Sequence, residues 1–149
     1  MDDPTCTFCK IGAKQSPAAI IYENEQAIAF MDINPVPEGH GLVVPKRHYR
    51  NLFDFPDEDA AGVMHAARVV AKALRKTLNA DGMSLVLSSE RAAGQVIFHA
   101  HFHLFPRHHD DGMTRSGRAR EGHAPSQGDG SPAGLQALAE KIRANLVED

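Results

Sequence analysis

Apolar residues in the first two thirds of the chain gather in short runs rather than in long uninterrupted stretches. The runs are rich in β-branched and aromatic side chains and are bounded by Gly, Pro, Asn and Asp, which is the pattern of strands joined by turns. This pattern predicts five strands, at residues 18–22, 26–31, 41–44, 83–87 and 96–105.

Two further segments carry apolar residues at the spacing of a helix. One stripe begins after Asp57, ends at the turn-forming residues 79–82, and consists of Val63, Ala67, Val70, Leu74 and Leu78. The other lies near the C-terminus and consists of Leu135, Leu138, Ile142 and Leu146. Because the strands come in a run with one long helix between them, and not in βαβ alternation, the sequence predicts an α+β fold with an antiparallel sheet.

A chain of 149 residues is long enough for one domain with a full core. Residues 1–107 hold the predicted sheet and the long helix, and residues 133–149 hold the C-terminal helix. Between them, residues 108–132 are rich in glycine and charged residues and poor in apolar ones. We interpret this segment as a flexible loop or linker that either covers a site or forms a solvated tether.

Composition excludes some classes of protein. Hydrophobic residues make up 42% of the chain and charged residues 23%, and no apolar run reaches the roughly 18 residues of a membrane span. The net charge of −3 argues against a nucleic-acid surface, which needs clustered Lys and Arg. The acidic N-terminus lacks the basic and apolar regions of a signal peptide. We therefore expect a cytoplasmic protein with reduced cysteines and with no membrane or nucleic-acid partner.

Histidine is the unusual component, because the chain has nine and five of them lie between His99 and His109. Residues 98–105 alternate strictly, so a strand there would place His99, His101 and His103 on one face and apolar side chains on the other. Residues two apart on a strand are about 6.6 Å apart, close enough to act on one substrate or one metal. Mutual repulsion of their protonated forms would keep at least one ring neutral and nucleophilic.

Four segments together resemble the histidine triad (HIT) family. The signature is a Gly-Gln pair followed by three histidines at alternate positions, AGQVIFHAHFHLFPR at residues 93–107. Upstream segments match the family in the same order, and these are CTFCKI at 6–11, AFMDINP at 29–35 and GHGLVVPKRH at 39–48. The resemblance points to the zinc-containing, bacterial Hint-like branch and does not extend past residue 107.

The resemblance implies hydrolysis or transfer of a nucleotidyl group through a covalent nucleotidyl-histidine. By its place in the motif, His101 would be the nucleophile, with its other ring nitrogen donating a proton to a backbone carbonyl. His103 would donate to a phosphate oxygen as negative charge builds there. His40 matches a family histidine near the triad and either relays a proton or serves as a hydrogen-bonding partner.

The same resemblance implies the nucleotide contacts. Asp32 aligns with a carboxylate that accepts both ribose hydroxyls, although the residues around it also form a good turn that Asp could merely stabilise. Phe30 and Ile33 would form an apolar slot for the base. Gly94 and Gln95 would bring backbone amides and a side chain toward the phosphates.

Two positions depart from the family pattern. Ser88 stands where relatives generally carry Asn or Gln, and its short side chain would reach the phosphate or the leaving group through water. Val96 stands where the phosphoramidase branch often has a hydroxyl. Both changes leave the predicted nucleophile intact and put the identity of the leaving group in question.

Cys6 and Cys9 form a CxxC pair, whose spacing alone does not decide between a redox site, a metal site and no role. The resemblance supplies His48 and His99 as the other two ligands of a structural zinc ion, which would make His99 a ligand rather than a base. The competing hypothesis is a catalytic metal held by the three histidines of the triad.

We therefore expect a HIT-type nucleotidyl hydrolase that needs no catalytic metal. Its substrate would be a purine nucleoside phosphoramidate, or a related adenylate or dinucleoside polyphosphate. Two rivals stay open, a nucleotidyl transferase that passes the nucleotide to a second acceptor and a zinc-stabilised nucleotide-binding interaction module. The resemblance also implies a homodimer in which the two sheets join.

Overall fold

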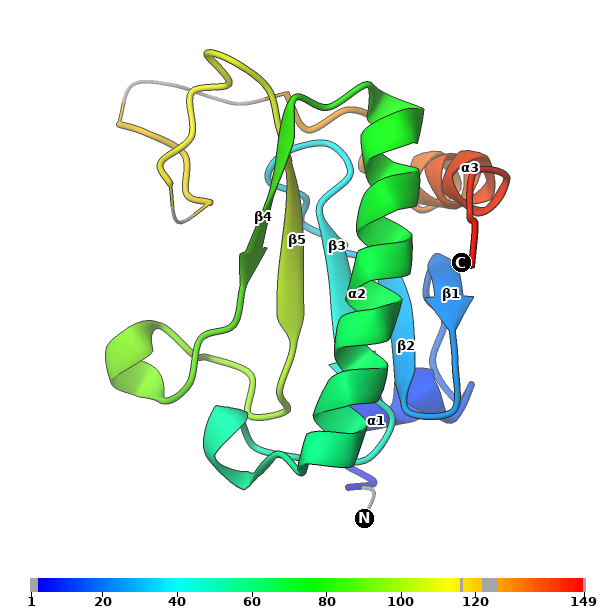
Figure 1. Cartoon of the computed structure of the whole chain (residues 1–149), viewed down its shortest axis with the longest axis vertical. Coiled ribbons are helices and arrows are strands. Elements are labelled where there is room, and N and C mark those ends of the chain that lie inside the picture. The colour runs from blue at the N-terminus through cyan, green and yellow to red at the C-terminus, as the bar shows by residue number, and fades with distance from the viewer. Residues whose placement is uncertain (1–2, 116, 122–125, 149) are drawn as a thin grey trace.

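The computed structural model describes residues 3–115, 117–121 and 126–148. Its centre is an antiparallel sheet of five strands in the order β1-β2-β3-β5-β4 (Figure 1). The strands are β1 (Ile20–Glu23), β2 (Ala27–Met31), β3 (Gly41–Pro45), β4 (Gly82–Val86) and β5 (Phe102–Arg107). The predicted α+β class with one antiparallel sheet is confirmed.

Helix α2 (Asp57–Leu78) lies across one face of this sheet (Figure 1). Its first turn is acidic and its last turn basic, which suits the helix dipole, and Asn79 ends it in the left-handed conformation. Its buried stripe, which includes Val63, Val70 and Leu74, shares one core with Val43 and other residues of the sheet. Across the described ranges, no helix is both long and apolar enough to cross a membrane.

Helix α3 (Pro132–Arg143) packs beside β1 and α2 (Figure 1). It begins after Ser131, whose hydroxyl accepts the N–H of Gly134 at 3.1 Å and so caps the helix. Leu135 and Ile142 are buried in the common core. Leu146 ends the predicted stripe and lies beyond the helix, although it still packs against that core.

The predicted strand at residues 96–105 is wrong in its first part, because β5 begins only at Phe102. The preceding residues run outside the sheet. There the N–H of Ala100 donates to the carbonyl of Tyr49 at 2.7 Å, and imidazole nitrogens bond to nearby carbonyls. Such contacts compete with the strand ladder that an alternating pattern implies. Of the three triad histidines, His103 alone therefore lies within a strand.

Three elements of one or two turns lie at the end of the molecule where α2 begins (Figure 1). They are α1 (Thr7–Gly12), η1 (Leu52–Asp54) and η2 (Arg91–Ala93). The hydrophobic pattern does not predict them, because elements this short have no room to show a period.

Part of the predicted 108–132 linker forms a small hairpin, whose two arms are residues 112–115 and 117–120. Met113 and Ala119 form an antiparallel β-bridge between the arms, and Met113 is buried. The predictions for residues 116 and 122–125 lie outside the described residues.

Candidate active site and metal centre

A cleft of about 600 Å³ opens beside the end of β2, between α1 and the loop of residues 94–97. Two of the predicted catalytic side chains line it, His101 and His103. All of the predicted nucleotide-binding residues line it as well, namely Phe30, Asp32, Ile33, Ser88, Gly94 and Gln95. His40 is not part of the lining, because it is buried and reaches the cleft through its contact with His103.

His101 is buried, and one hydrogen bond fixes its orientation. Its Nδ1 lies 2.8 Å from the carbonyl oxygen of His99, and because a carbonyl only accepts, Nδ1 carries the proton. Nε2 then holds a lone pair. Burial lowers the pKa of His101 below its usual value, while the His99 carbonyl and the Asp32 carboxylate act to raise it. A neutral ring with an available lone pair can act as a nucleophile.

A chain of hydrogen bonds sets the protons on His40 and His103. The N–H of Val36 donates to Nδ1 of His40 at 3.3 Å, so the proton of the neutral His40 ring sits on Nε2. That Nε2 donates to Nδ1 of His103 at 2.9 Å, which leaves His103 with an Nε2–H to donate. Burial, followed by the effect of neighbouring imidazoles, lowers the pKa of both rings to about 4, so both are neutral near pH 7.

Asp32 serves both a turn and the cleft. Its Oδ1 accepts the N–H of Asn34 at 2.8 Å, which is the turn contact that the sequence indicates. Its Oδ2 lies 3.5 Å from Nε2 of His40. Burial raises the pKa of Asp32, whereas the Asn34 N–H and the nearby histidines act to lower it. Each carboxylate oxygen has two lone pairs, so the group can still accept hydrogen bonds from a ligand.

The apolar wall of the cleft is larger than the sequence predicts. The ring of Phe8 lies 5.6 Å from that of Phe30 and 5.3 Å from that of His101, between centroids. Phe8 and Ile11 come from α1, and both are buried while lining the cleft. On the same lining, Ile33 is 75% exposed and therefore available to a ligand. The three-residue spacing of Phe8 and Ile11 was the signal for this wall, because it matches a helix face.

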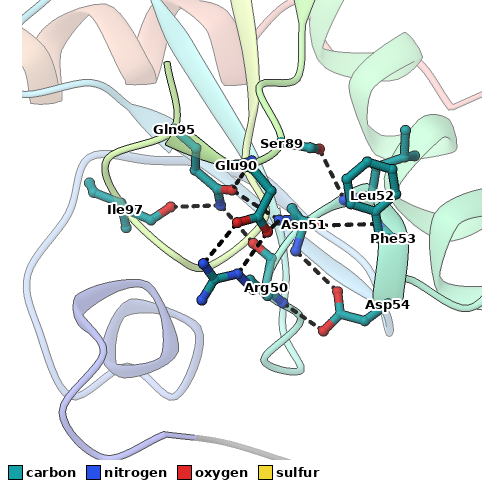
Figure 2. A network of polar contacts seen from close by, with 9 residues as sticks. All are labelled: Arg50, Asn51, Leu52, Phe53, Asp54, Ser89, Glu90, Gln95 and Ile97. Carbon is teal, nitrogen blue, oxygen red and sulfur yellow. Dashed lines mark hydrogen bonds and ion pairs between the residues drawn. The ribbon is translucent and has the colours of Figure 1, made fainter. Parts of the chain in front are cut away.

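A polar network holds the loop of residues 94–97 (Figure 2). Oε1 of Gln95 accepts the N–H of Glu90 at 2.8 Å and Nδ2 of Asn51 at 3.1 Å. Nε2 of Gln95 donates to two backbone carbonyls, at 2.7 and 3.0 Å. The whole side-chain amide is thus used within the protein. Gln95 therefore fixes the loop, and the contact with phosphates that the resemblance implies for this residue stays a prediction.

Glu90 joins this network to the segment that precedes η1. Its backbone has φ 75° and ψ 161°, a region that is favourable only for glycine. Arg50 donates to its carboxylate at 2.8 and 2.9 Å, and Asn51 donates to the same group. These bonds lower the pKa of Glu90 to about 2. The sequence gives no sign of the network, because its two halves lie about forty residues apart.

Cys6, Cys9, His48 and His99 converge, and their ligand atoms all lie within 4.8 Å of one another. Three sulfur–nitrogen separations are 3.4 Å, and the two Nδ1 atoms of the histidines are 3.2 Å apart. A tetrahedral zinc ion with ordinary bond lengths requires about 3.5 Å between sulfur and nitrogen and about 3.3 Å between two nitrogens. The four residues therefore fit a zinc ion.

The orientation of His99 also suits a metal ligand. Its Nε2 lies 2.8 Å from the carbonyl oxygen of Pro45, so Nε2 carries the proton and Nδ1 presents its lone pair to the cysteines. The competing hypothesis of a metal on the triad finds no support in this geometry. Among the described residues, the second group that could hold a metal is Asp32, His40 and His103, and no such group joins His99 to the other two triad histidines.

The family model of the HIT domain matches residues 13–110. The chain therefore belongs to the HIT family, as its motifs indicate. A relative with a described activity is the adenylylsulfatase HINT3 of Arabidopsis thaliana. It is 36% identical over 111 residues, which make up 74% of this chain and 56% of the plant protein.

Solved structures share the HIT-like fold over nearly the whole chain. A Hit-like protein from Bartonella henselae, described as involved in cell-cycle regulation, has a TM-score of 0.80 at 34% identity and covers 98% of this chain and 100% of its own. A zinc-bound histidine triad family protein from Mycobacterium smegmatis has a TM-score of 0.77 at 34% identity. That match covers 95% of this chain and 92% of the mycobacterial one.

Proposed function

We propose that this protein is a nucleotidyl hydrolase that works through a covalent nucleotidyl-histidine on His101. The observation that carries the proposal is the hydrogen bond from Nδ1 of His101 to the His99 carbonyl, because it leaves a neutral ring with a lone pair at the cleft. The cleft volume of about 600 Å³ is in the range of small-molecule sites. The plant adenylylsulfatase among the relatives supports hydrolysis at a nucleotide phosphate.

The reaction has two steps. First, the Nε2 lone pair of His101 bonds to the α-phosphorus, and the bond from that phosphorus to the leaving group breaks, with its electron pair going to the leaving group. The proton on Nδ1 stays in the hydrogen bond to His99. Then water bonds to the phosphorus and gives up a proton to solvent, and the phosphorus–nitrogen bond breaks with its electron pair returning to Nε2. The products are a nucleoside monophosphate and the leaving group.

Other residues of the cleft bind and orient the nucleotide. The Nε2–H of His103 donates to a phosphate oxygen as charge builds there, and His40 holds His103 in the donating tautomer. The remaining lone pairs of Asp32 accept the ribose hydroxyls. The apolar wall around Phe8 and Phe30 takes a purine base.

Cys6, Cys9, His48 and His99 would hold a structural zinc ion. The tetrahedral separations of their ligand atoms and the zinc-bound mycobacterial relative support this assignment. With four protein ligands, the ion has no open position for substrate. It would tie α1 and the segment after β3 to His99, whose carbonyl orients His101.

A homodimer joined along β4 completes the proposal. Strand β4 pairs with β5 on one side, and its other edge has no strand partner within the described part of the chain. Leu85 on β4 and Ile97 in the loop of residues 94–97 are exposed apolar side chains. Open edges with apolar side chains favour pairing with a second copy. Sedimentation of the wild type as a dimer, and of Leu85→Arg as a monomer, would support this arrangement, and a monomeric wild type would contradict it.

The experiment that tests the function is turnover of adenosine 5′-phosphoramidate, adenylyl sulfate and a dinucleoside polyphosphate by the wild type and by His101→Asn. The wild type should release AMP, whereas the variant should still fold and bind AMP but lose turnover, because an amide is not a nucleophile. More than a few per cent of wild-type kcat in the variant would contradict the covalent mechanism. Transfer of AMP to added acceptors would indicate a transferase, and binding without turnover an interaction module.

A further inference from the structure

The cleft provides little positive charge for a substrate rich in phosphate. Its described lining contains no Lys or Arg, and the ionisable side chains in that lining are Asp32, His101 and His103. One of these is a carboxylate, and none of them is a permanently charged ammonium or guanidinium group. Phosphate groups in proteins are commonly met by Arg or Lys. A counter-charge for the substrate must therefore come from outside this lining.

Arg118 places such a charge at the edge of the cleft. A β-carbon on Gly94 would lie 3.2 Å from Nη2 of Arg118, so the guanidinium lies against this glycine. Gly94 itself lines the cleft, and its φ of 93° is a conformation that glycine adopts without strain. Because Gly94 has no side chain, this residue does not block the guanidinium from the loop of residues 94–97.

The backbone of Arg118 belongs to the folded hairpin rather than to a loose tether. Its carbonyl accepts the N–H of Thr114 at 2.7 Å, and its N–H donates to Oγ1 of Thr114 at 3.2 Å. A β-carbon on the adjacent Gly117 would overlap the ring of Phe105. The hairpin is thus packed closely against β5, the strand that carries His103.

The guanidinium of Arg118 is available to a ligand. Two arginines nearby in the chain or in the site are already paired, Arg107 with Asp111 and Arg50 with Glu90. Arg118 is exposed, and its guanidinium has no hydrogen-bond or ion-pair partner among the described residues. Its charge is therefore not neutralised by them.

We propose that Arg118 binds the leaving group of the substrate and selects anionic leaving groups, such as sulfate, phosphate or a polyphosphate chain, over amines. This inference rests on the proposed hydrolase and narrows its substrate class. When the bond from the α-phosphorus to the bridging oxygen breaks, its electron pair adds negative charge to the leaving group, which a guanidinium stabilises. An amine takes up a proton from solvent as it leaves and therefore departs without negative charge. Ser88 and Val96, the two positions that depart from the family pattern, supply no charge either.

The test compares two substrates that share the same nucleotide, adenylyl sulfate and adenosine 5′-phosphoramidate. In Arg118→Ala, kcat/KM for adenylyl sulfate should fall roughly 10- to 100-fold, the usual effect of losing a charged hydrogen-bond donor. The value for the phosphoramidate should change by less than about threefold. Arg118→Lys keeps the charge but lacks the planar guanidinium. Its kcat/KM for adenylyl sulfate should therefore lie between those of the wild type and Arg118→Ala. Lys141→Ala, which removes one positive charge from α3, is the matched control and should leave both values unchanged.

An equal loss on both substrates, or no loss on adenylyl sulfate, would overturn the assignment of Arg118. A wild type that turns over neither substrate would instead overturn the hydrolase proposal. Calorimetry then decides the role of Arg118 separately. The wild type should bind adenylyl sulfate at least about tenfold more tightly than Arg118→Ala does, and equal affinities would refute the contact.

Discussion

The imidazoles of the cleft have different properties because their ring nitrogens face different backbone partners. A carbonyl, that of His99, fixes the proton of His101 on Nδ1 and leaves Nε2 as a lone pair. The backbone amide of Val36 donates to His40, and His40 donates to Nδ1 of His103. His103 is therefore left with a proton on Nε2 that it can donate. The family motif predicts that His101 is the nucleophile. It does not reveal the tautomer of His103, because that depends on a backbone amide distant in sequence.

Burial of His40 predicts a loss of stability in acid. Its pKa is about 4 in the folded protein, below the usual 6.5 of an unfolded chain. The unfolded state therefore binds more protons below about pH 6.5, so this contribution to the free energy of unfolding is present above that pH and is lost as the pH falls toward 4. Between about pH 7 and pH 4, the melting temperature of His40→Asn should fall less than that of the wild type. The difference between the two falls should be on the order of 5 °C.

The control for this prediction is His65→Asn, which removes an imidazole on the exposed face of α2. It should lose as much melting temperature as the wild type over the same pH range. Loss of a bound metal in acid would affect all three proteins, so the difference between them isolates His40. Equal losses in His40→Asn and the wild type would contradict the prediction.

Asp32 gives a prediction about the sugar. Asp32→Asn can keep the oxygen that accepts the Asn34 N–H, but it replaces the second oxygen with a donor. We expect KM for ribonucleotides to rise roughly tenfold and the preference over 2′-deoxy analogues to shrink. Melting temperature should change little, because the turn contact remains. An unchanged preference, measured with paired ribose and deoxyribose substrates, would leave Asp32 with the turn alone.

Among the elements, those with a sustained period follow from the sequence and the others do not. Strands β2 and β3 and helix α2 bury regular sets of apolar residues, and the pattern finds them within one or two positions. The alternation at residues 98–101 also predicts a strand, but these residues have no ladder, because their hydrogen bonds go to a loop and to imidazoles. Helix α1 is too short to show a sustained period, and the three-residue spacing of Phe8 and Ile11 is too brief a signal to predict the wall that they form.

The network behind the loop of residues 94–97 predicts that a residue outside the cleft affects catalysis. Asn51 is buried and does not line the cleft, yet it donates to both Gln95 and Glu90. If the network positions the loop, Asn51→Ala and Gln95→Ala should lower kcat/KM by similar factors, on the order of tenfold. Steady-state kinetics at a temperature where both variants are folded would measure this. A loss confined to Gln95→Ala would show instead that Gln95 acts on the substrate directly.

At the scale of the whole molecule, the cysteine–histidine cluster should stabilise the fold more than it aids the chemistry. The purified protein should hold one zinc ion per chain, and Cys9→Ser should lose it. The melting temperature of the variant should fall by on the order of 10 °C, because binding free energy is added to the folded state. Metal analysis and melting curves check this, with His65→Asn as the control that keeps its zinc. Full zinc in Cys9→Ser, or none in the wild type, would contradict the assignment.

The assembled site shows how far sequence reasoning reaches. Family motifs supply many of the side chains that line the cleft and the four candidate ligands, because those residues lie in recognisable segments. Other residues that position or complement these side chains lie outside the motifs. Arg50 and Glu90 resemble ordinary surface charges, and Arg118 lies in the segment where the resemblance ends. Only the three-dimensional arrangement places the guanidinium of Arg118 beside Gly94.

The most direct test of the covalent mechanism is mass spectrometry of the protein quenched during turnover of adenylyl sulfate. The quench is kept alkaline, because a phosphorus–nitrogen bond to imidazole is labile in acid. A nucleotidyl-histidine mechanism predicts a mass increase of one adenylyl group, located on His101, absent from His101→Asn, and lost again as substrate is exhausted. An adduct on a different residue, or turnover by His101→Asn at the wild-type rate, would contradict it.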